Sequence, residues 1–112
     1  MDNQPSTSST PYSLGALVSR IVDAVAPRRI FLFGSAATGR MEADSDLDVL
    51  VVVPDGTHRR QAAMRIYKHL QGYGFATDVL VATESDLKQH GSNPHLVYSH
   101  VLNEGMEIYH AA

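Results

Sequence analysis

Ile30–Ser35 (IFLFGS) and Asp46–Val53 (DLDVLVVV), ten residues apart, decide the fold of this chain. Their β-branched and aromatic residues favour two strands, of which the first ends in a Gly-Ser turn and the second begins with two carboxylates. Because side chains alternate between the faces of a strand, we expect Asp46 and Asp48 on the same face. Two like charges this close repel each other, and a fold usually keeps such a pair when a cation lies between them.

A third carboxylate, Asp78, stands in the middle of the apolar stretch 75–82, where acidic residues are rare. If this third strand lies beside the second, Asp78 joins Asp46 and Asp48. Carboxylate oxygens are the ligands that Mg²⁺ prefers, and three carboxylates suit two Mg²⁺ ions that act on phosphates. Two alternatives stay open: Asp78 as a half-buried partner of an arginine, and the other two as charges on an edge strand.

The Gly34-Ser35 turn is a candidate phosphate-binding loop. Glycine lets the backbone approach a phosphate closely, and the amides of the following turn, together with the Ser35 hydroxyl, favour an anion. Arg40 either adds a charge-assisted bond to the phosphate or pairs with Glu42 or Asp44 at the surface. The loop lacks the Gly-Lys-Ser/Thr ending of a Walker A motif, and an ordinary strand-to-helix turn is the other interpretation.

Length and composition limit the classes of protein to which the chain can belong. With 112 residues, a net charge of −3 and no cysteine, it fits one domain at 13–112 that follows a flexible, Ser/Thr-rich tail at 1–12. The acidic balance disfavours extended binding to nucleic acid, and disulfides and thiolate metal sites are excluded. No stretch has the length of a membrane span or the pattern of a secretion signal, which fits a cytoplasmic protein. The six histidines do not have the spacing of a zinc site.

Hydrophobic periodicity and turn residues predict an α/β (α+β) domain with helices layered on a sheet. We expect Ser13 and Thr57 to cap the first two helices, Thr83 and Asp86 to form a capping box, and Asn93-Pro94 to begin the last helix. The expected elements are a helix from 14 to just before Pro27, strands 28–33 and 46–53, a helix after 57, a strand 75–82, a short helix after 83, a helix 94–104 and a strand 106–110.

The helix after Thr57 has an apolar stripe and a basic side. The stripe is predicted to pack into the core and consists of Ala63, Ile66, Tyr67 and Leu70. The basic side consists of His58, Arg59, Arg60, Arg65 and Lys68. Its default interpretation is a solvated face, and the alternative is a docking surface for an acidic partner or a nucleotide.

These motifs resemble the signature of the DNA polymerase β-like nucleotidyltransferase superfamily, which combines Gly-Ser, a fixed spacing, Asp-x-Asp and a later strand aspartate. The small size and the stretch 98–105 with Tyr109 are similar to its minimal nucleotidyltransferase (MNT) branch. The likeness covers residues 13–109. It implies a mixed sheet flanked by helices and the transfer of a nucleoside monophosphate, often AMP from ATP, to a hydroxyl group.

The resemblance also implies roles for individual residues. Asp46 and Asp48 would bind two Mg²⁺ ions, Asp78 would bind the catalytic metal and help to deprotonate the acceptor, and Gly34-Ser35 would hold the distal phosphates. Thr38 departs from the pattern, because many relatives have arginine before the glycine that corresponds to Gly39, so phosphate affinity or partner choice can differ.

Members of the MNT branch are often encoded beside a helical protein of the HEPN type, and several act as antitoxins that modify a tyrosine of that partner. The resemblance therefore implies a toxin–antitoxin pair. Two other functions stay open: a non-catalytic module that neutralises a partner by contact, and an enzyme that modifies a small molecule such as an antibiotic. Relatives that modify antibiotics have an additional helical domain, for which 112 residues leave no room. We therefore expect the acceptor site to come from a partner or from a second copy in a homodimer.

Overall fold

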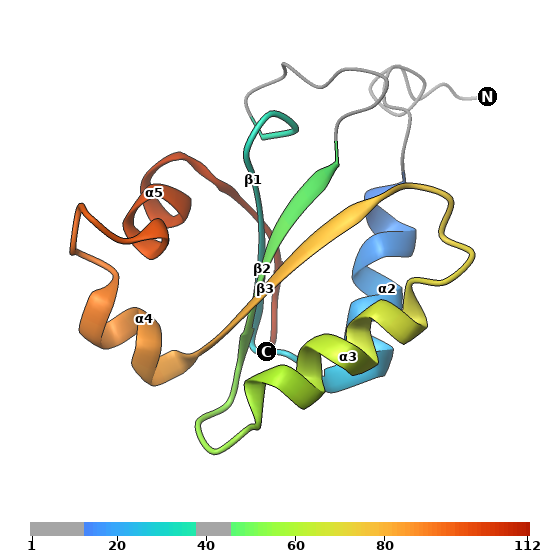
Figure 1. Ribbon diagram of the computed structural model, residues 1–112, viewed down its shortest axis with the longest axis horizontal. Helices are drawn as coiled ribbons and strands as arrows, with labels where there is room; N and C mark the ends of the chain where they lie inside the picture. The colour runs from blue at the N-terminus through green and yellow to red at the C-terminus, as the bar shows by residue number, and fades with distance from the viewer. Residues whose placement is uncertain (1–12, 38–45) are drawn as a thin grey trace.

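The computed structural model describes residues 13–37 and 46–112, which form a four-stranded mixed sheet between two layers of helices (Figure 1). Helices α2 and α3 cover one face of the sheet, and helices α4 and α5 cover the other. No helix in these two ranges is long and apolar enough to cross a membrane. The elements in chain order are α2 (Leu14–Val25), β1 (Arg29–Phe33), β2 (Leu47–Val53), α3 (Arg59–His69), β3 (Thr77–Thr83), α4 (Glu84–His90), α5 (Val97–Glu104) and β4 (Met106–His110).

Strand β2 lies in the interior of the sheet, whose order is β3-β2-β1-β4. It pairs in parallel with β3 and antiparallel with β1, and β4 extends the sheet antiparallel to β1. Every residue of β2 except Asp48 is buried. A strand covered on both faces is expected to be apolar at nearly every position, which explains the run of valines and leucines.

The sheet has a separate apolar cluster on each face. Helix α2 begins at the Ser13 cap, whose hydroxyl accepts a hydrogen bond from the Ala16 amide at 3.1 Å, as the sequence predicts. Leu17 and Ile21 of α2 and Ile66 of α3 pack with the odd-numbered residues of β2. The cluster on the other face is smaller and consists of Phe31, Leu50, Val52, Ala82 and Val101.

The junction between β3 and α4 has no loop. Thr83 is the last residue of the strand and also the N-cap of the helix. Its hydroxyl accepts from the Asp86 amide at 3.1 Å, and the Asp86 carboxylate accepts from the Thr83 amide at 2.9 Å. This reciprocal pair confirms the predicted capping box.

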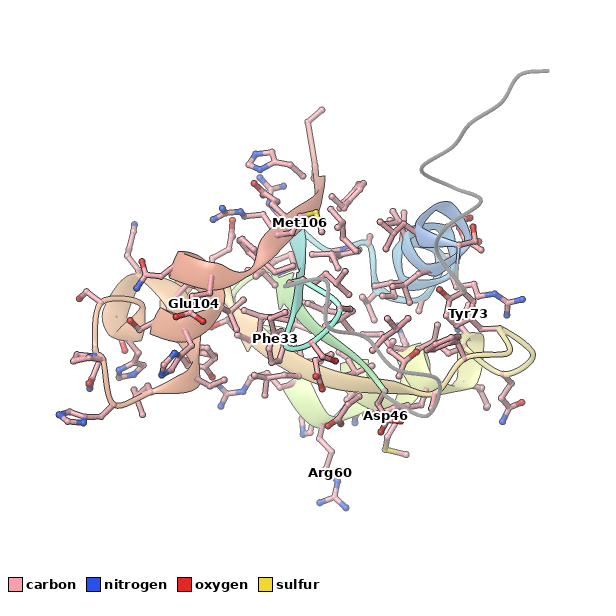
Figure 2. The ribbon with its side chains drawn as sticks, turned by 90° about the horizontal axis from the view of Figure 1, so that it is seen from above. Phe33, Asp46, Arg60, Tyr73, Glu104 and Met106 are labelled. Atoms are coloured by element: carbon pink, nitrogen blue, oxygen red, sulfur yellow. The ribbon has the colours of Figure 1, made fainter. Side chains whose placement is uncertain are left out.

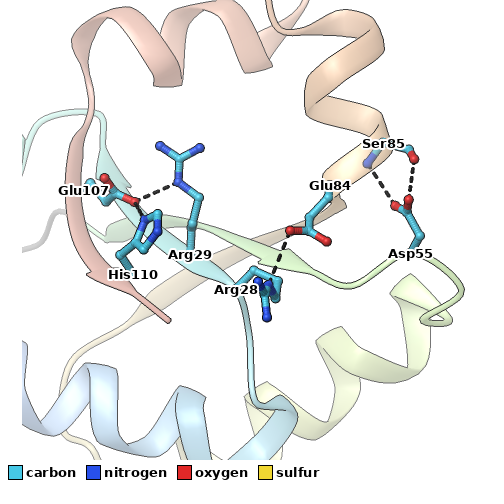
Figure 3. A network of polar contacts seen from close by, with 7 residues as sticks. All are labelled: Arg28, Arg29, Asp55, Glu84, Ser85, Glu107 and His110. Carbon is cyan, nitrogen blue, oxygen red and sulfur yellow. Dashed lines mark hydrogen bonds and ion pairs between the residues drawn. The ribbon is translucent and has the colours of Figure 1, made fainter. Parts of the chain in front are cut away.

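Polar contacts hold the helices and the edge strand to the sheet on the side shown in Figure 3. Arg29 of β1 donates to Glu107 of β4 at 2.7 Å, and Arg28 donates to Glu84 of α4 at 3.3 Å. The Ser85 amide and hydroxyl donate to Asp55, in the turn after β2, at 2.9 and 2.5 Å. These contacts connect segments around β2 that are far apart in sequence. Each exposed ion pair alone contributes little to the free energy of folding.

Two predicted helix starts are wrong. The N-cap of α3 is His58 and not Thr57, because the imidazole Nδ1 accepts from the Gln61 amide at 3.2 Å. Asn93 and Pro94 do not begin α5, which starts at Val97 after a Leu96 N-cap. The Asn93 side chain instead accepts from the His95 amide at 3.0 Å and closes a local turn.

The predicted apolar stripe of α3 is also partly wrong. Ile66 is fully buried, and Ala63 and Leu70 are half-buried against the core. Tyr67 is 44% exposed, and Ala62 is buried in its place. The buried stripe therefore runs through positions 62 and 66, so Tyr67 lies at the boundary of the helix face.

We expect Asp86→Asn to lower the free energy of unfolding by about 1 kcal/mol at neutral pH. The hydrogen bond from the Thr83 amide, followed by that from Arg59, holds the pKa of Asp86 below its ordinary value of 3.8. A lowered folded-state pKa stabilises the protein above the unfolded value, and this stabilisation is lost as the pH falls through the folded value. Urea unfolding from pH 7 to pH 2 should therefore show a flatter acid limb in the variant.

Asp23→Asn is the matched control, because Asp23 lies on the exposed side of α2. It should change neither the stability at pH 7 nor the acid limb. Wild-type stability of Asp86→Asn at pH 7 would contradict the role given to this carboxylate.

Candidate functional site

Three strand ends meet at one end of the sheet, where two of the predicted carboxylates, Asp48 and Asp78, are in register. Strands β2 and β3 begin at this end of the sheet, and β1 ends there in the turn that starts at Gly34. Asp48 is paired in register with Asp78 on one side and with Phe33 on the other. Figure 2 looks down on this end of the molecule, with Phe33 and Asp46 labelled.

Asp48 and Asp78 point to the same face of the sheet, because residues paired in register share a face. Neighbouring strands are about 4.8 Å apart, so the two side chains are close neighbours. Asp46 is two residues before Asp48 and exposed. The face is that of α4 and α5, because Leu50 and Val52 continue the same side of β2 into the cluster that contains Val101. The carboxylates therefore lie where this apolar cluster ends.

The surroundings of Asp48 disfavour its negative charge. Burial raises the pKa of the Asp48 carboxyl above its ordinary value of 3.8, and repulsion first by Asp78 and then by Asp46 raises it further. All three causes act in the same direction. A cation that binds among these oxygens would remove the repulsion.

Gly34 supports Asp48 from the adjoining turn. Its backbone is in the left-handed region, with φ +74°, which glycine adopts without strain. A Cβ atom at this position would lie 3.3 Å from Asp48 Cγ and would overlap Asp48 Oδ2. The turn can therefore approach the carboxylate only because residue 34 has no side chain. Ser35 follows half-buried at the beginning of the same turn.

A tyrosine that the sequence assigned to the core contacts the site. The Tyr67 hydroxyl of α3 accepts a hydrogen bond from the Val79 amide at 2.9 Å and donates to Asp78 Oδ1 at 3.5 Å. Its position, eleven residues before Asp78 and on another element, gave no local motif. The available signal was the hydroxyl of a tyrosine within an apolar stripe, because such a hydroxyl usually finds a hydrogen-bond partner.

The donor set fits a hard divalent cation. Asp46, Asp48 and Asp78 offer carboxylate oxygens, the ligand type of Mg²⁺, and their mutual repulsion calls for positive charge. Within residues 13–37 and 46–112, no three carboxylate or imidazole groups lie close enough together to hold a metal ion as the side chains stand.

Part of the predicted phosphate loop lies outside the described residues. Arg40, Thr38 and Gly39 lie outside the described residues, and so do Glu42 and Asp44, the alternative partners of Arg40. The phosphate contact of Arg40 therefore stays a prediction.

The basic side of α3 is exposed to solvent at Arg60, Arg65 and Lys68. Figure 2 shows Arg60 pointing away from the protein. Arg59 is different, because it pairs with Asp86 at 2.5 Å and so belongs to the contacts that hold α4. The alternative of a docking surface stays a prediction.

Residues 17–105 match the family model described as a nucleotidyltransferase domain. No curated protein sequence matches the chain. Among solved structures, a toxin–antitoxin with AMP-PNP is similar, with a TM-score of 0.64 and 19% identity over 88% of this chain and 74% of that chain.

Two further solved structures are similar. A MntA–HpeT toxin–antitoxin variant with two Asp-to-Glu substitutions has a TM-score of 0.62 and 16% identity over 88% of this chain and 74% of that chain. A Sulfolobus solfataricus protein, provisionally described as a nucleotidyltransferase, has a TM-score of 0.51 and 20% identity over 68% of this chain and 69% of that chain. At these identities the likeness shows a shared fold, and it confirms the predicted polymerase β-like architecture.

We expect Gly34→Ala to lower the free energy of unfolding by about 2 kcal/mol, from left-handed strain and from overlap with Asp48. Gly74→Ala is the matched control, because Gly74 has φ +89° but no atom within 4 Å of its Cβ position. It should show the strain alone, about 1 kcal/mol. In an Asp48→Ala background the excess cost of Gly34→Ala should shrink, as measured in a double-mutant cycle by chemical denaturation. Equal costs at Gly34 and Gly74 in both backgrounds would contradict the close approach.

We expect Asp48→Asn to stabilise the metal-free protein at pH 7 by about 1 kcal/mol. A raised folded-state pKa means that ionisation of Asp48 destabilises the fold, with no effect well below pH 3.8 and the full effect above the folded value. The gain should therefore be large at pH 7 and absent at pH 3 in thermal unfolding. Part of this gain in stability should vanish in an Asp78→Asn background, because Asp78 repels Asp48 more strongly than Asp46 does. A variant no more stable than the wild type at pH 7 would contradict the crowding of these charges.

Proposed function

Because the chain belongs to the nucleotidyltransferase domain family, we propose that it transfers a nucleoside monophosphate, AMP from ATP in the simplest case, to a hydroxyl group of a partner protein. One observation carries the proposal: Asp48 and Asp78 are paired in register on parallel strands, and the turn at Gly34 approaches the same carboxylate. Carboxylates beside a close-approaching turn are what a site for a metal-bound triphosphate requires.

Asp46, Asp48 and Asp78 would hold two Mg²⁺ ions, and the Asp78 carboxylate would also accept the proton of the attacking hydroxyl. When bound, Mg²⁺ neutralises phosphate charge and lowers the pKa of the attacking group. The protein itself contributes orientation. The register fixes Asp78 beside Asp48, and burial on the side of Leu50 keeps Asp48 partly out of water.

Gly34 and Ser35 would bind the distal phosphates. The left-handed Gly34 lets the backbone of the turn come close to a ligand, and the amides after it suit an anion. Arg40 would add a charge-assisted bond from the part of the loop outside the described residues.

The acceptor is proposed to be a helical protein of the HEPN type, with this chain as the antitoxin. Two of the similar structures are toxin–antitoxins, of which one contains AMP-PNP. The other carries Asp-to-Glu substitutions at two positions that are two residues apart, the spacing of Asp46 and Asp48. These descriptions support nucleotide as substrate, a protein as partner and an aspartate pair as the reactive centre. A nucleoside triphosphate substrate fits a cytoplasmic site of action.

Transfer of label from α-labelled ATP to the product of the neighbouring gene, in the presence of Mg²⁺, tests the proposal. We expect labelling by the wild type and a loss of at least about 100-fold in Asp46→Ala/Asp48→Ala, because both metal-binding oxygen sets are removed. Asp23→Ala, on the exposed side of α2, is the control and should label at the wild-type rate.

Three other results would contradict the transfer of a nucleotide to a protein partner. No label from any of the four nucleoside triphosphates would overturn the proposal. Neutralisation of the partner by the double variant at normal expression would identify a module that acts by contact. Turnover of hydroxylated small molecules without a protein partner would identify a small-molecule enzyme.

A further inference from the structure

Tyr67 is the one side chain of α3 that the structure shows in a hydrogen bond with a carboxylate of the site. Its hydroxyl has a single proton, and it uses that proton toward Asp78 Oδ1 because its oxygen accepts from the Val79 amide. The two contacts, 3.5 and 2.9 Å long, connect α3 to two consecutive residues of β3.

The contact forms because β3 is an edge strand. Only one side of β3 pairs with a neighbour, β2, so the Val79 amide on the other side lacks a strand partner. The Tyr67 hydroxyl supplies an acceptor for this amide and so fixes its own position. Because the backbone amide holds the hydroxyl oxygen in place, the hydroxyl proton points in a defined direction.

The helix that carries Tyr67 is itself held firmly. The preceding residue, Ile66, is fully buried in the core. Arg20 of α2 donates to the carbonyl oxygens of His69 and Gln71 at the end of α3, both at 2.9 Å. The hydroxyl is therefore on a rigid element, whereas Asp78 is exposed and would otherwise be free to change rotamer.

We propose that Tyr67 is the positioning residue of Asp78. By engaging Oδ1 from the edge of the sheet, it leaves Oδ2 directed to the face that Asp78 shares with Asp48. The inference rests on the proposed function for its catalytic consequence, although the positioning itself does not depend on it. In this role Tyr67 acts through Asp78 and not on the substrate itself.

Tyr67→Phe removes the hydroxyl and keeps the ring, so the variant should fold. We expect kcat for label transfer to fall about tenfold with KM for ATP changed less than twofold, and the Mg²⁺ concentration for half-maximal rate to rise severalfold. In the metal-free protein we expect faster exchange of the Val79 amide hydrogen and greater mobility of the Asp78 carboxyl carbon in ¹³C NMR relaxation.

Tyr73→Phe is the matched control. The Tyr73 hydroxyl donates to the Ser13 carbonyl oxygen at 2.9 Å, at the α2 end of the molecule, and Tyr73 is at the loop after α3. Loss of the Tyr73 hydroxyl should lower the melting temperature about as much as Tyr67→Phe does. The kinetic constants, the Mg²⁺ requirement and the Asp78 signal should stay at wild-type values.

The outcomes separate this inference from the proposed function. An Asp78 carboxyl equally ordered in Tyr67→Phe and wild type would overturn the positioning role, whatever the activity. Kinetic changes of the same size in Tyr67→Phe and Tyr73→Phe would also overturn it, because they would reflect stability alone. Absence of transfer by the wild type would overturn the proposed function, and the NMR measurement would still decide the role of Tyr67.

Discussion

The burial of β2 between two strands and two helical layers is the constraint on which the rest of the structure depends. Six of its seven residues have no exposed surface, and the exception is Asp48. A slip of one residue would turn Asp48 into the cluster of α2 and α3 and would bring an unpaired charge into the core. The hydrophobic pattern therefore fixes the register of β2, and the register alone places Asp48 beside Asp78 and Phe33.

One part of β2 therefore belongs to the core and another part to the site. From Val49 onward it is closed to water on both faces, and its first residues extend past the cover of α4 and α5. There the chain keeps Asp48, whose charge is disfavoured by burial and by the neighbouring carboxylates, and a glycine turn that only a residue without a side chain can make. Such local costs, at positions where apolar residues would be more stable, are typical of functional sites.

Much of this arrangement follows from the sequence, because it depends on patterns within single elements. The apolar runs predict the strands, the Thr83–Asp86 pair predicts its helix start, and Asp-x-Asp predicts two carboxylates on one face. The failures concern competition between local groups. The His58 imidazole caps α3 instead of the Thr57 hydroxyl, and Asn93 closes a turn before α5 can begin. The contact of Tyr67 depends on which strand lies at the edge, and that order, β3-β2-β1-β4, cannot be deduced from periodicity.

The edge position of β3 also sets the order in which the molecule loses its structure on heating. An edge strand is held by one ladder, whereas β2 is held by two and by the core on both faces, so fluctuations that detach β3 require less free energy than global unfolding. Because one of the three carboxylates belongs to β3 and two precede or begin β2, such an opening separates the acidic group at 78 from the other two. Thermal inactivation should accordingly set in before the cooperative transition, and recovery on cooling should be rapid because the core has not come apart.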